Sequence, residues 1–417
     1  MTTEIIYLDN AATSWPKPPA MAEAITTYIN SPNGNPGRGG HRASVNAART
    51  VDTARQRLAS LINAEDPSRL ILAHSATDAL NTAIHGAIDA ACELPYFQPR
   101  PHVVTTVLEH NAVLRPLYAL QHRKRIDLTL VTCDYQGFVD PDELIKACTP
   151  RTALLAVTHA SNVLGTIQPI RDIAARLREK SPHTLFLVDA SQTVGHIPVD
   201  VQADLADLLA FPTHKALLGP PGIGALYISP RAYSPDDADP RLDPHIQGGT
   251  GGNSDDPLMP RALPHHFEAG TCNAPGMAGL LAALDEHERL HKSGAHAHEK
   301  DLTGQILEFL LSTPGVRVLG PKDTDRRVSV VSFTTHKHDA GELASILDAS
   351  FNIAVRAGLQ CAPGAHHAMG TDVPAQTGEC GAKGGGGAVR ASPGPYSKQS
   401  DVDAFKAAIT EIIDNAD

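Results

Sequence analysis

Residues 152–191 read TALLAVTHASNVLGTIQPIRDIAARLREKSPHTLFLVDAS, and they contain two apolar runs separated by an amphipathic stretch. The runs at 152–157 and 184–188 are short and continuous, which is typical of buried strands. Between them, residues 170–180 repeat apolar side chains at helical spacing. A strand, a helix and a second strand in this order form a βαβ unit, which predicts parallel strands in a sheet covered on both faces.

The same alternation extends in both directions from this unit. Five further apolar runs are RLILAH (69–74), HVVTTVLEH (102–110), IDLTLVTC (126–133), DLLAF (207–211) and GALYIS (224–229). Together the seven runs predict an α/β fold with a mostly parallel seven-stranded sheet covered by helices. We expect a large domain over residues 20–285, a smaller α+β C-terminal domain over residues 286–417, and an N-terminal segment, residues 1–19, that joins them. The Pro-, Asp- and Gly-rich residues 231–265 predict a long excursion.

Composition narrows the class of protein. The net charge of the 417 residues is −11 with no basic block, so nucleic acid is not an expected partner. No apolar run approaches the length of a membrane span, and the N-terminal MTTEIIYLDNAATSWP lacks the pattern of a secretory signal. The six cysteines form no CxxC pair, which favours a reduced, cytoplasmic protein.

Polar residues follow the predicted strands, where open α/β sheets bind their ligands. Lys215 follows the run at 207–211, and it is either a surface lysine or an amine held neutral in an apolar site, ready to form a Schiff base. Asp189 follows the run at 184–188, and it either caps a helix or pairs with a cation such as a protonated pyridine nitrogen.

Three other strand ends carry candidate ligand-binding groups. Ser75, Ala76 and Thr77 open a predicted helix whose N–H groups suit a phosphate, although S-x-x-D is also an ordinary helix cap. His110 is suited to stacking on an aromatic ring, or else is a structural histidine. Asn162 is an uncharged donor for a phenolic oxygen or a carboxylate.

Motifs in order along nearly the whole chain resemble those of one family. They are YLDNAATSWPKP, EHNAVLRPL, THASNVLGTIQPI, LVDASQTVGHIPVDV, DLLAFPTHKALLGPPGIGALYI, HFEAGTCNAPG, VRAGLQCAPGAH and AVRASPGPYSKQSDVD. The sequence is similar to cysteine desulfurases and selenocysteine lyases, which are class V, fold-type I transferases that use pyridoxal 5′-phosphate (PLP).

The resemblance implies a role for each matching residue. Lys215 would bind PLP covalently, Asp189 would contact the pyridine nitrogen, and His110 would stack on the ring. Gln192 and Asn162 would lie near the phenolate oxygen. The residues implied at the phosphate are Ala76, Thr77 and His214. Thr271 would reach the phosphate in a neighbouring subunit, so the expected assembly is a homodimer with shared active sites.

Cys361 and Arg390 distinguish desulfuration from other PLP chemistry. Cys361 matches the family's persulfide-forming cysteine, and a thiolate is the nucleophile needed to accept sulfur. Arg390 matches the arginine that binds the substrate α-carboxylate, together with Asn162, a task suited to a guanidinium fork. The alternatives are a small core cysteine and a surface ion pair.

The implied reaction converts L-cysteine to L-alanine, with Lys215 moving the Cα proton and Cys361 receiving the sulfur. That sulfur would serve iron–sulfur cluster or other sulfur-compound biosynthesis through an acceptor, either a protein or a small molecule. Rival functions are a selenocysteine lyase, a C–S lyase, an epimerase, or a scaffold with the same fold and no activity.

Two features depart from the family pattern. Pro212 replaces the usual Ser or Thr and a glycine is absent before His214, so Thr213 is the expected substitute for the missing phosphate-binding hydroxyl. The Gly-rich stretch 370–388, which contains Cys380, lengthens the segment before Arg390; it is a lid, a docking element, a second thiol or a featureless insertion. No metal site is predicted, because His366, His367 and Cys380 lack a recognisable ligand spacing.

Overall fold

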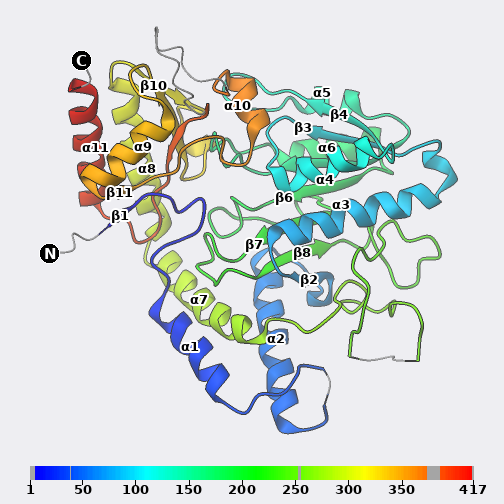
Figure 1. Ribbon diagram of the computed structural model, residues 1–417. Helices are drawn as coiled ribbons and strands as arrows, with labels where there is room; N and C mark the ends of the chain where they lie inside the picture. Colours follow the sequence, from blue (N-terminus) through cyan, green and yellow to red (C-terminus); the bar gives the residue numbers. More distant parts are fainter. Residues whose placement is uncertain (1–4, 38, 252–254, 373–385, 416–417) are drawn as a thin grey trace.

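The computed structural model describes residues 5–37, 39–251, 255–372 and 386–415. A seven-stranded sheet lies at its centre (Figure 1). In spatial order the strands are β2 (Leu70–Ala73), β8 (Gly224–Ile228), β7 (Leu208–Pro212), β6 (Leu185–Asp189), β5 (Thr152–Thr158), β3 (His102–Thr106) and β4 (Asp127–Val131). The pairs from β7 to β4 are parallel, whereas β8 is antiparallel to both β7 and β2. The predicted mostly parallel, seven-stranded sheet is confirmed.

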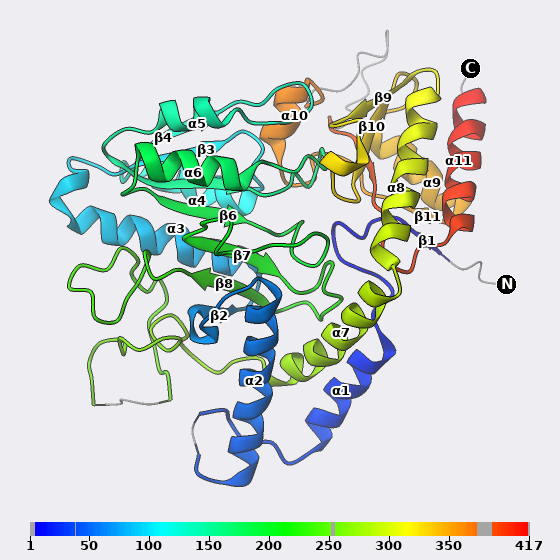
Figure 2. The ribbon, with the colours of Figure 1, turned by 180° about the vertical axis from the view of Figure 1, so that it is seen from behind.

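Helices cover both faces of this sheet (Figures 1 and 2). On one face lie α2 (Arg42–Leu61), α5 (Pro141–Ala147), α6 (Ile170–Lys180) and α7 (Ala274–Lys292); on the other lie α3 (Ala76–Glu93) and α4 (Asn111–His122). Within β5, Leu155 and Val157 pack on the first face, while Leu154 and Ala156 pack on the second. Because helices cover both faces of the strand, the side chains on each face are buried. The strand therefore has no polar face, and its sequence is continuously apolar.

A smaller sheet forms the C-terminal part of the molecule. Its antiparallel strands, in spatial order, are β12 (Val389–Ala391), β10 (Val331–Thr335) and β9 (Val316–Leu319). Helices α8 (Ala295–Ser312), α9 (Ala340–Phe351) and α11 (Gln399–Asp414) pack against it in a separate apolar core. The short helix α10 (Pro363–Met369) lies between this part and the large sheet (Figure 1). The sheet and its helices agree with the predicted α+β C-terminal part.

The N-terminal segment runs along the C-terminal part before it enters the large one. Strand β1 (Ile6–Tyr7) pairs with β11 (Ile353–Ala354), and α1 (Pro19–Asn30) then packs on α7. The predicted domain boundary at 285/286 lies inside α7, and the chain turns at Gly294, whose φ is +84°. The division into domains therefore stays a prediction.

The remaining described segments are short or irregular. The 3₁₀ turns are η1 (Pro67–Arg69), η2 (Pro95–Phe97) and η3 (Thr324–Arg326). Between β8 and α7, the described residues form neither helix nor strand, in agreement with the expected excursion over 231–265. Among the described helices, none combines the length and the apolar character that crossing a membrane requires.

Candidate active site

A cavity of about 240 Å³ lies at the carboxyl ends of the parallel strands and extends to the C-terminal part. Ten predicted site residues line it: Ala76, Thr77, His110, Asn162, Asp189, Gln192, His214, Lys215, Cys361 and Arg390. They come from seven segments that are far apart in sequence. The structure therefore brings these residues together as expected, and the chemical role of each one stays a prediction.

Lys215 follows β7 and lies in the cavity wall, half-buried. Burial lowers the pKa of its amine to about 8, although the negative charge of Asp189 acts in the opposite direction. A surface lysine would keep its ordinary pKa, so that alternative does not describe this residue. At pH 7 about a tenth of amines with such a pKa is unprotonated and nucleophilic.

Asp189 ends β6 at the same level as Thr158 on β5 and Ala210 on β7. Its side chain is buried, and its Oδ1 accepts a hydrogen bond from the Ser191 N–H at 3.0 Å. No helix begins after Asp189, so the helix-cap alternative is wrong. The carboxylate is instead presented to the cavity by a turn at the strand end.

The first turn of α3 forms another part of the wall. Ser75 caps this helix by accepting the Asp78 N–H at 3.1 Å, so the capping interpretation of S-x-x-D is correct. The same turn also presents Ala76 and Thr77 to the cavity, where helical N–H groups have no intrahelical acceptor. Strand β8 approaches this turn closely at Gly224, where an added Cβ would lie 2.3 Å from the backbone carbon of Ser75.

His110 precedes α4 and caps it. Its Nδ1 accepts the Ala112 N–H at 3.0 Å, which leaves Nε2 to carry the proton of the neutral ring. Burial lowers the pKa of this imidazole, and the positive charge of Lys215 contributes in the same direction. The residue is therefore both a structural cap and a neutral ring at the cavity.

Arg390, on β12, is the buried cation of the site, with 3% of its surface exposed. It donates to the Asn162 carbonyl at 3.0 Å and to Asp9 Oδ1 at 2.6 Å, while its Nε is buried and has no hydrogen-bond partner among the described residues. The ion pair exists, but it is not a surface pair. These contacts use two of the five N–H donors of the guanidinium, so further donors remain for a ligand.

Cys361 is exposed, whereas the other described cysteines are partly buried. The alternative that it is a small core residue is therefore wrong. It lies in a tight turn in which Gln360 and Cys361 have φ of +46° and +60°, a conformation that L-residues seldom adopt. Hydrogen bonds hold this turn in place. Asn162 donates to the Gln360 carbonyl at 2.6 Å, and the Asn111 N–H donates to the Cys361 carbonyl at 2.7 Å.

Two predicted residues do not reach the cavity. Thr213 is fully buried, and its hydroxyl donates to the Ile223 carbonyl at 3.2 Å, so it does not supply the hydroxyl that Pro212 lacks. Thr271 lines a second cavity, of about 300 Å³, together with Glu268. Cys380 and the Gly-rich residues 373–385 lie outside the described residues.

Other residues belong to the site without having been predicted. Gln360 and Arg356 line the cavity, and both lie in the motif VRAGLQC, whose residue types offered the signal. Lys17 donates to the His214 carbonyl at 2.6 Å, and burial lowers the pKa of its amine to about 8. Glu109 is fully buried beside the wall. Lys17 and Glu109 also lie in quoted motifs, YLDNAATSWPKP and EHNAVLRPL, but their burial depends on contacts that the sequence does not show.

Comparisons with known proteins show the family to which the chain is similar. The sequence profile described as Aminotransferase class-V matches residues 6–405. A probable cysteine desulfurase of Methanothermobacter thermautotrophicus is 32% identical over 98% of this chain and 94% of its own. A cysteine desulfurase of Cronobacter sakazakii is also 32% identical, over 98% and 93%. The apo structure of a cysteine desulfurase from Thermococcus onnurineus has a TM-score of 0.84 at 29% identity, over 99% and 96% of the two chains.

Proposed function

The chain belongs to the class V aminotransferase family and, within it, to the cysteine desulfurases, and on that premise we propose that it converts L-cysteine to L-alanine with PLP as cofactor and passes the sulfur to Cys361. One observation carries the proposal. The exposed thiol of Cys361 lines the same cavity as Lys215, Asp189 and Arg390.

The residues of the cavity fit PLP. Lys215 supplies an amine whose pKa is lowered to about 8, as attack on an aldehyde requires. Asp189 supplies a buried carboxylate for the ring nitrogen. The first turn of α3, which Gly224 allows β8 to approach, supplies N–H groups for the phosphate. When bound, PLP withdraws electrons from the amino acid and so makes its Cα proton acidic.

The remaining contacts to the cofactor follow from the residues around it. We propose that His110 stacks on the ring in its neutral form. We assign Gln192 and Asn162 to the phenolate oxygen of the cofactor. We assign Ala76, Thr77 and His214 to its phosphate.

Substrate binding is assigned to Arg390 and Asn162. Arg390 lines the cavity, and each of its two terminal nitrogens carries a second N–H that suits a substrate α-carboxylate. Because the same nitrogens also donate to the Asn162 carbonyl and to Asp9, the guanidinium is held in a fixed orientation. A substrate carboxylate bound to Arg390 would hold the substrate inside the cavity.

Lys215 and Cys361 perform the proton and sulfur transfers. The Lys215 amine removes the Cα proton of the substrate and later returns a proton. The Cys361 thiolate attacks the substrate sulfur, so that the Cβ–S bond breaks, an S–S bond forms and Cβ takes up a proton. L-cysteine and the enzyme thiol thus become L-alanine and an enzyme persulfide, with atoms and charge balanced.

Mapping of sulfur tests the proposal. After incubation of the holoenzyme with L-cysteine, mass spectrometry should find one added sulfur atom on Cys361, and alanine should accumulate. Cys361→Ala should lower the rate of alanine formation at least about tenfold. Cys133→Ala is the matched control, because burial raises the pKa of the Cys133 thiol to about 11 and keeps it protonated.

Each outcome separates the rival functions. Full activity of Cys361→Ala would exclude the persulfide step and favour a C–S lyase. Wild-type protein that makes no alanine from L-cysteine would favour an inactive scaffold. A parallel assay with L-selenocysteine distinguishes a selenocysteine lyase.

The proposal extends to assembly. We assign Thr271, which lines the second cavity, to the phosphate of a neighbouring subunit in a homodimer. An acceptor protein or small molecule would then remove the sulfur from Cys361 in the cytoplasm.

A further inference from the structure

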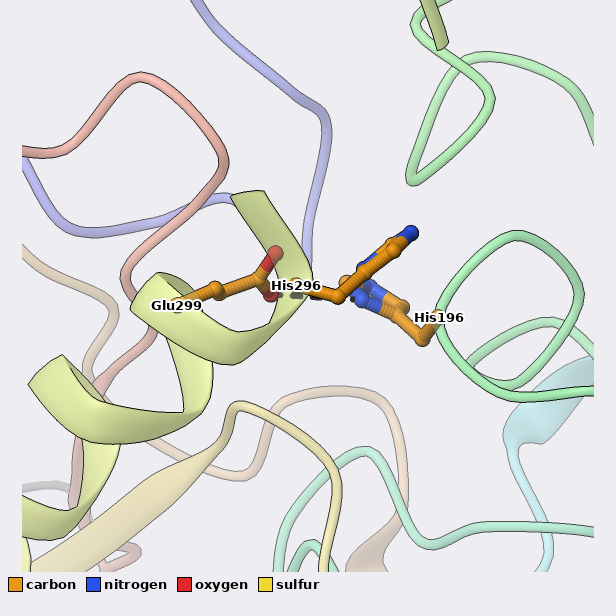
Figure 3. A group of neighbouring side chains, drawn as sticks. All are labelled: His196, His296 and Glu299. Carbon is orange, nitrogen blue, oxygen red and sulfur yellow. Dashed lines mark ion pairs between the residues drawn. The ribbon is translucent and has the colours of Figure 1, made fainter. Parts of the chain in front are cut away.

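A second group of ligand-type side chains lies apart from the cavity that holds Lys215. His196 lies on the turn that follows β6, whereas His296 and Glu299 lie on α8 (Figure 3). The three side chains point toward one another and line a cavity of about 210 Å³. About one hundred residues separate His196 from the other two, so the spacing of these residues in the sequence does not predict the group.

The geometry of the three ligand atoms suits a single ion. His296 and Glu299 are three residues apart on one helix, which puts both on the same face. His196 Nδ1 lies 3.2 Å from Glu299 Oε1. Two ligands bound at about 2.0–2.1 Å in a tetrahedron lie about 3.3 Å apart, so this pair is already at the required separation. All three ligand atoms lie within 4.8 Å of one another, and His296 is partly exposed.

Glu299 supplies an independent observation. Only 2% of its surface is exposed, and neither carboxylate oxygen has a hydrogen bond of good geometry among the described residues; its polar neighbours are His196 and the Ser329 side chain. A buried carboxylate without well-formed hydrogen bonds is costly, and these two contacts compensate it only in part. A divalent cation would satisfy both oxygens.

Nearby cations are directed elsewhere. Arg327 lines the cavity, but its guanidinium donates to the carbonyls of Val330 and Leu164, and Lys300 pairs with Asp325. They therefore leave the space between the imidazoles and the carboxylate to a ligand.

We propose that His196, His296 and Glu299 bind one zinc-class divalent metal ion, with water at the open coordination position. Two imidazoles and one carboxylate suit Zn²⁺ and its relatives better than Mg²⁺ or Ca²⁺, which prefer oxygen ligands. Because the ligands come from the turn after β6 and from α8, the ion links the large sheet to the C-terminal part. This site does not depend on the proposed desulfurase activity.

Cobalt substitution tests the site. Tag-free holoenzyme is dialysed against chelator, without L-cysteine, and then titrated with Co²⁺ and, separately, with Zn²⁺. We expect one Co²⁺ per chain, a visible d–d spectrum without a thiolate charge-transfer band, and a rise in Tm with Zn²⁺. Glu299→Gln and His296→Ala should each weaken binding about tenfold or more and abolish the rise in Tm.

The control is His291→Ala, which removes an exposed histidine whose ring lies 5.1 Å from that of His296. This variant should bind Co²⁺ as the wild type does. Equal binding by all variants, a thiolate charge-transfer band, or no binding to the wild type would overturn the proposal. If Glu299→Gln fails to fold, His296→Ala alone decides, since its side chain is only partly buried.

Discussion

Glu109 shows how burial changes the acidity of a carboxyl group. It follows β3, and its Oε1 accepts hydrogen bonds from the Thr106 hydroxyl at 2.7 Å and the Thr158 N–H at 2.9 Å. Its Oε2 is buried and has no hydrogen-bond partner in the part of the chain that the structure describes. Burial raises the pKa of this carboxyl to about 8; the two hydrogen bonds lower it in part, and the charge of Asp189 raises it further. At neutral pH the group is largely protonated in the folded protein.

This raised pKa predicts how stability depends on pH. Between about pH 4.5 and 8, the folded protein keeps a proton that the unfolded chain has lost, so this group makes stability fall as pH rises. Glu109→Gln keeps the neutral shape and should remove this fall, which is at most about 1.4 kcal/mol per pH unit. The measurement is the Tm of holoenzyme and variant across this range.

The control for this prediction is Glu411→Gln, an exposed position on α11. Its Tm should follow that of the wild type at every pH. If the Glu109→Gln curve also ran parallel to the wild-type curve, the carboxyl at 109 would be ionised in both states, and the prediction would fail.

At the scale of elements, the junction of β8 with α3 depends on one glycine. A Cβ at Gly224 would lie 2.3 Å from the Ser75 backbone, so Gly224→Ala must push the first turn of α3 away from the strand. We expect a loss of stability of about 1–3 kcal/mol and weaker binding of PLP, because the turn assigned to the phosphate moves. Urea unfolding of the apo protein and PLP titration measure the two effects.

A matched substitution separates this clash from a general effect of alanine. Gly304→Ala adds the same methyl group within α8, where the nearest atom is a Thr324 methyl at 3.5 Å, an ordinary contact. This variant should be at least as stable as the wild type and should bind PLP normally. Equal PLP affinity in Gly224→Ala would argue against the phosphate assignment.

The elements also show what sequence could predict. The strands were predictable because five of the seven, β3 and β5 to β8, are buried along their whole length and are therefore mostly apolar, and the edge strands β2 and β4 are partly buried. The strand ends carried Lys215, Asp189 and His110, and parallel topology alone brings such ends to one edge. The antiparallel direction of β8 was not predictable, because a buried strand has the same pattern in either direction.

Contacts that depend on packing between distant segments left no sequence pattern. Thr213 has the right residue type and position for a phosphate ligand, but the backbone turns its hydroxyl toward the Ile223 carbonyl. Gln360 became part of the site only because the turn before Cys361 docks on Asn162. The pairing of His196 with Glu299 likewise exists only in three dimensions.

At the scale of the whole molecule, the N-terminal segment connects the two parts of the chain at the site. Leu8 packs in the core of the C-terminal part, and the Ser14 N–H donates to the carbonyl of His214, next to Lys215. Between them, Asp9 pairs with the buried Arg390 at 2.6 Å. The segment therefore supplies the counterion for the cation that the proposal assigns to substrate binding.

Loss of this counterion should destabilise the whole fold. Asp9→Ala leaves Arg390 buried with an unpaired charge, which costs about 3–5 kcal/mol, and the urea midpoint should fall accordingly. Asp9→Asn keeps a hydrogen-bond acceptor and should fall less. Asp285→Ala, which breaks the more exposed pair of Arg57 and Asp285, should change the midpoint little. If Asp9→Ala changed the midpoint as little as Asp285→Ala, then water would have to solvate the Arg390 charge, or another anion would have to neutralise it. The N-terminal segment would then not be needed to fix that residue.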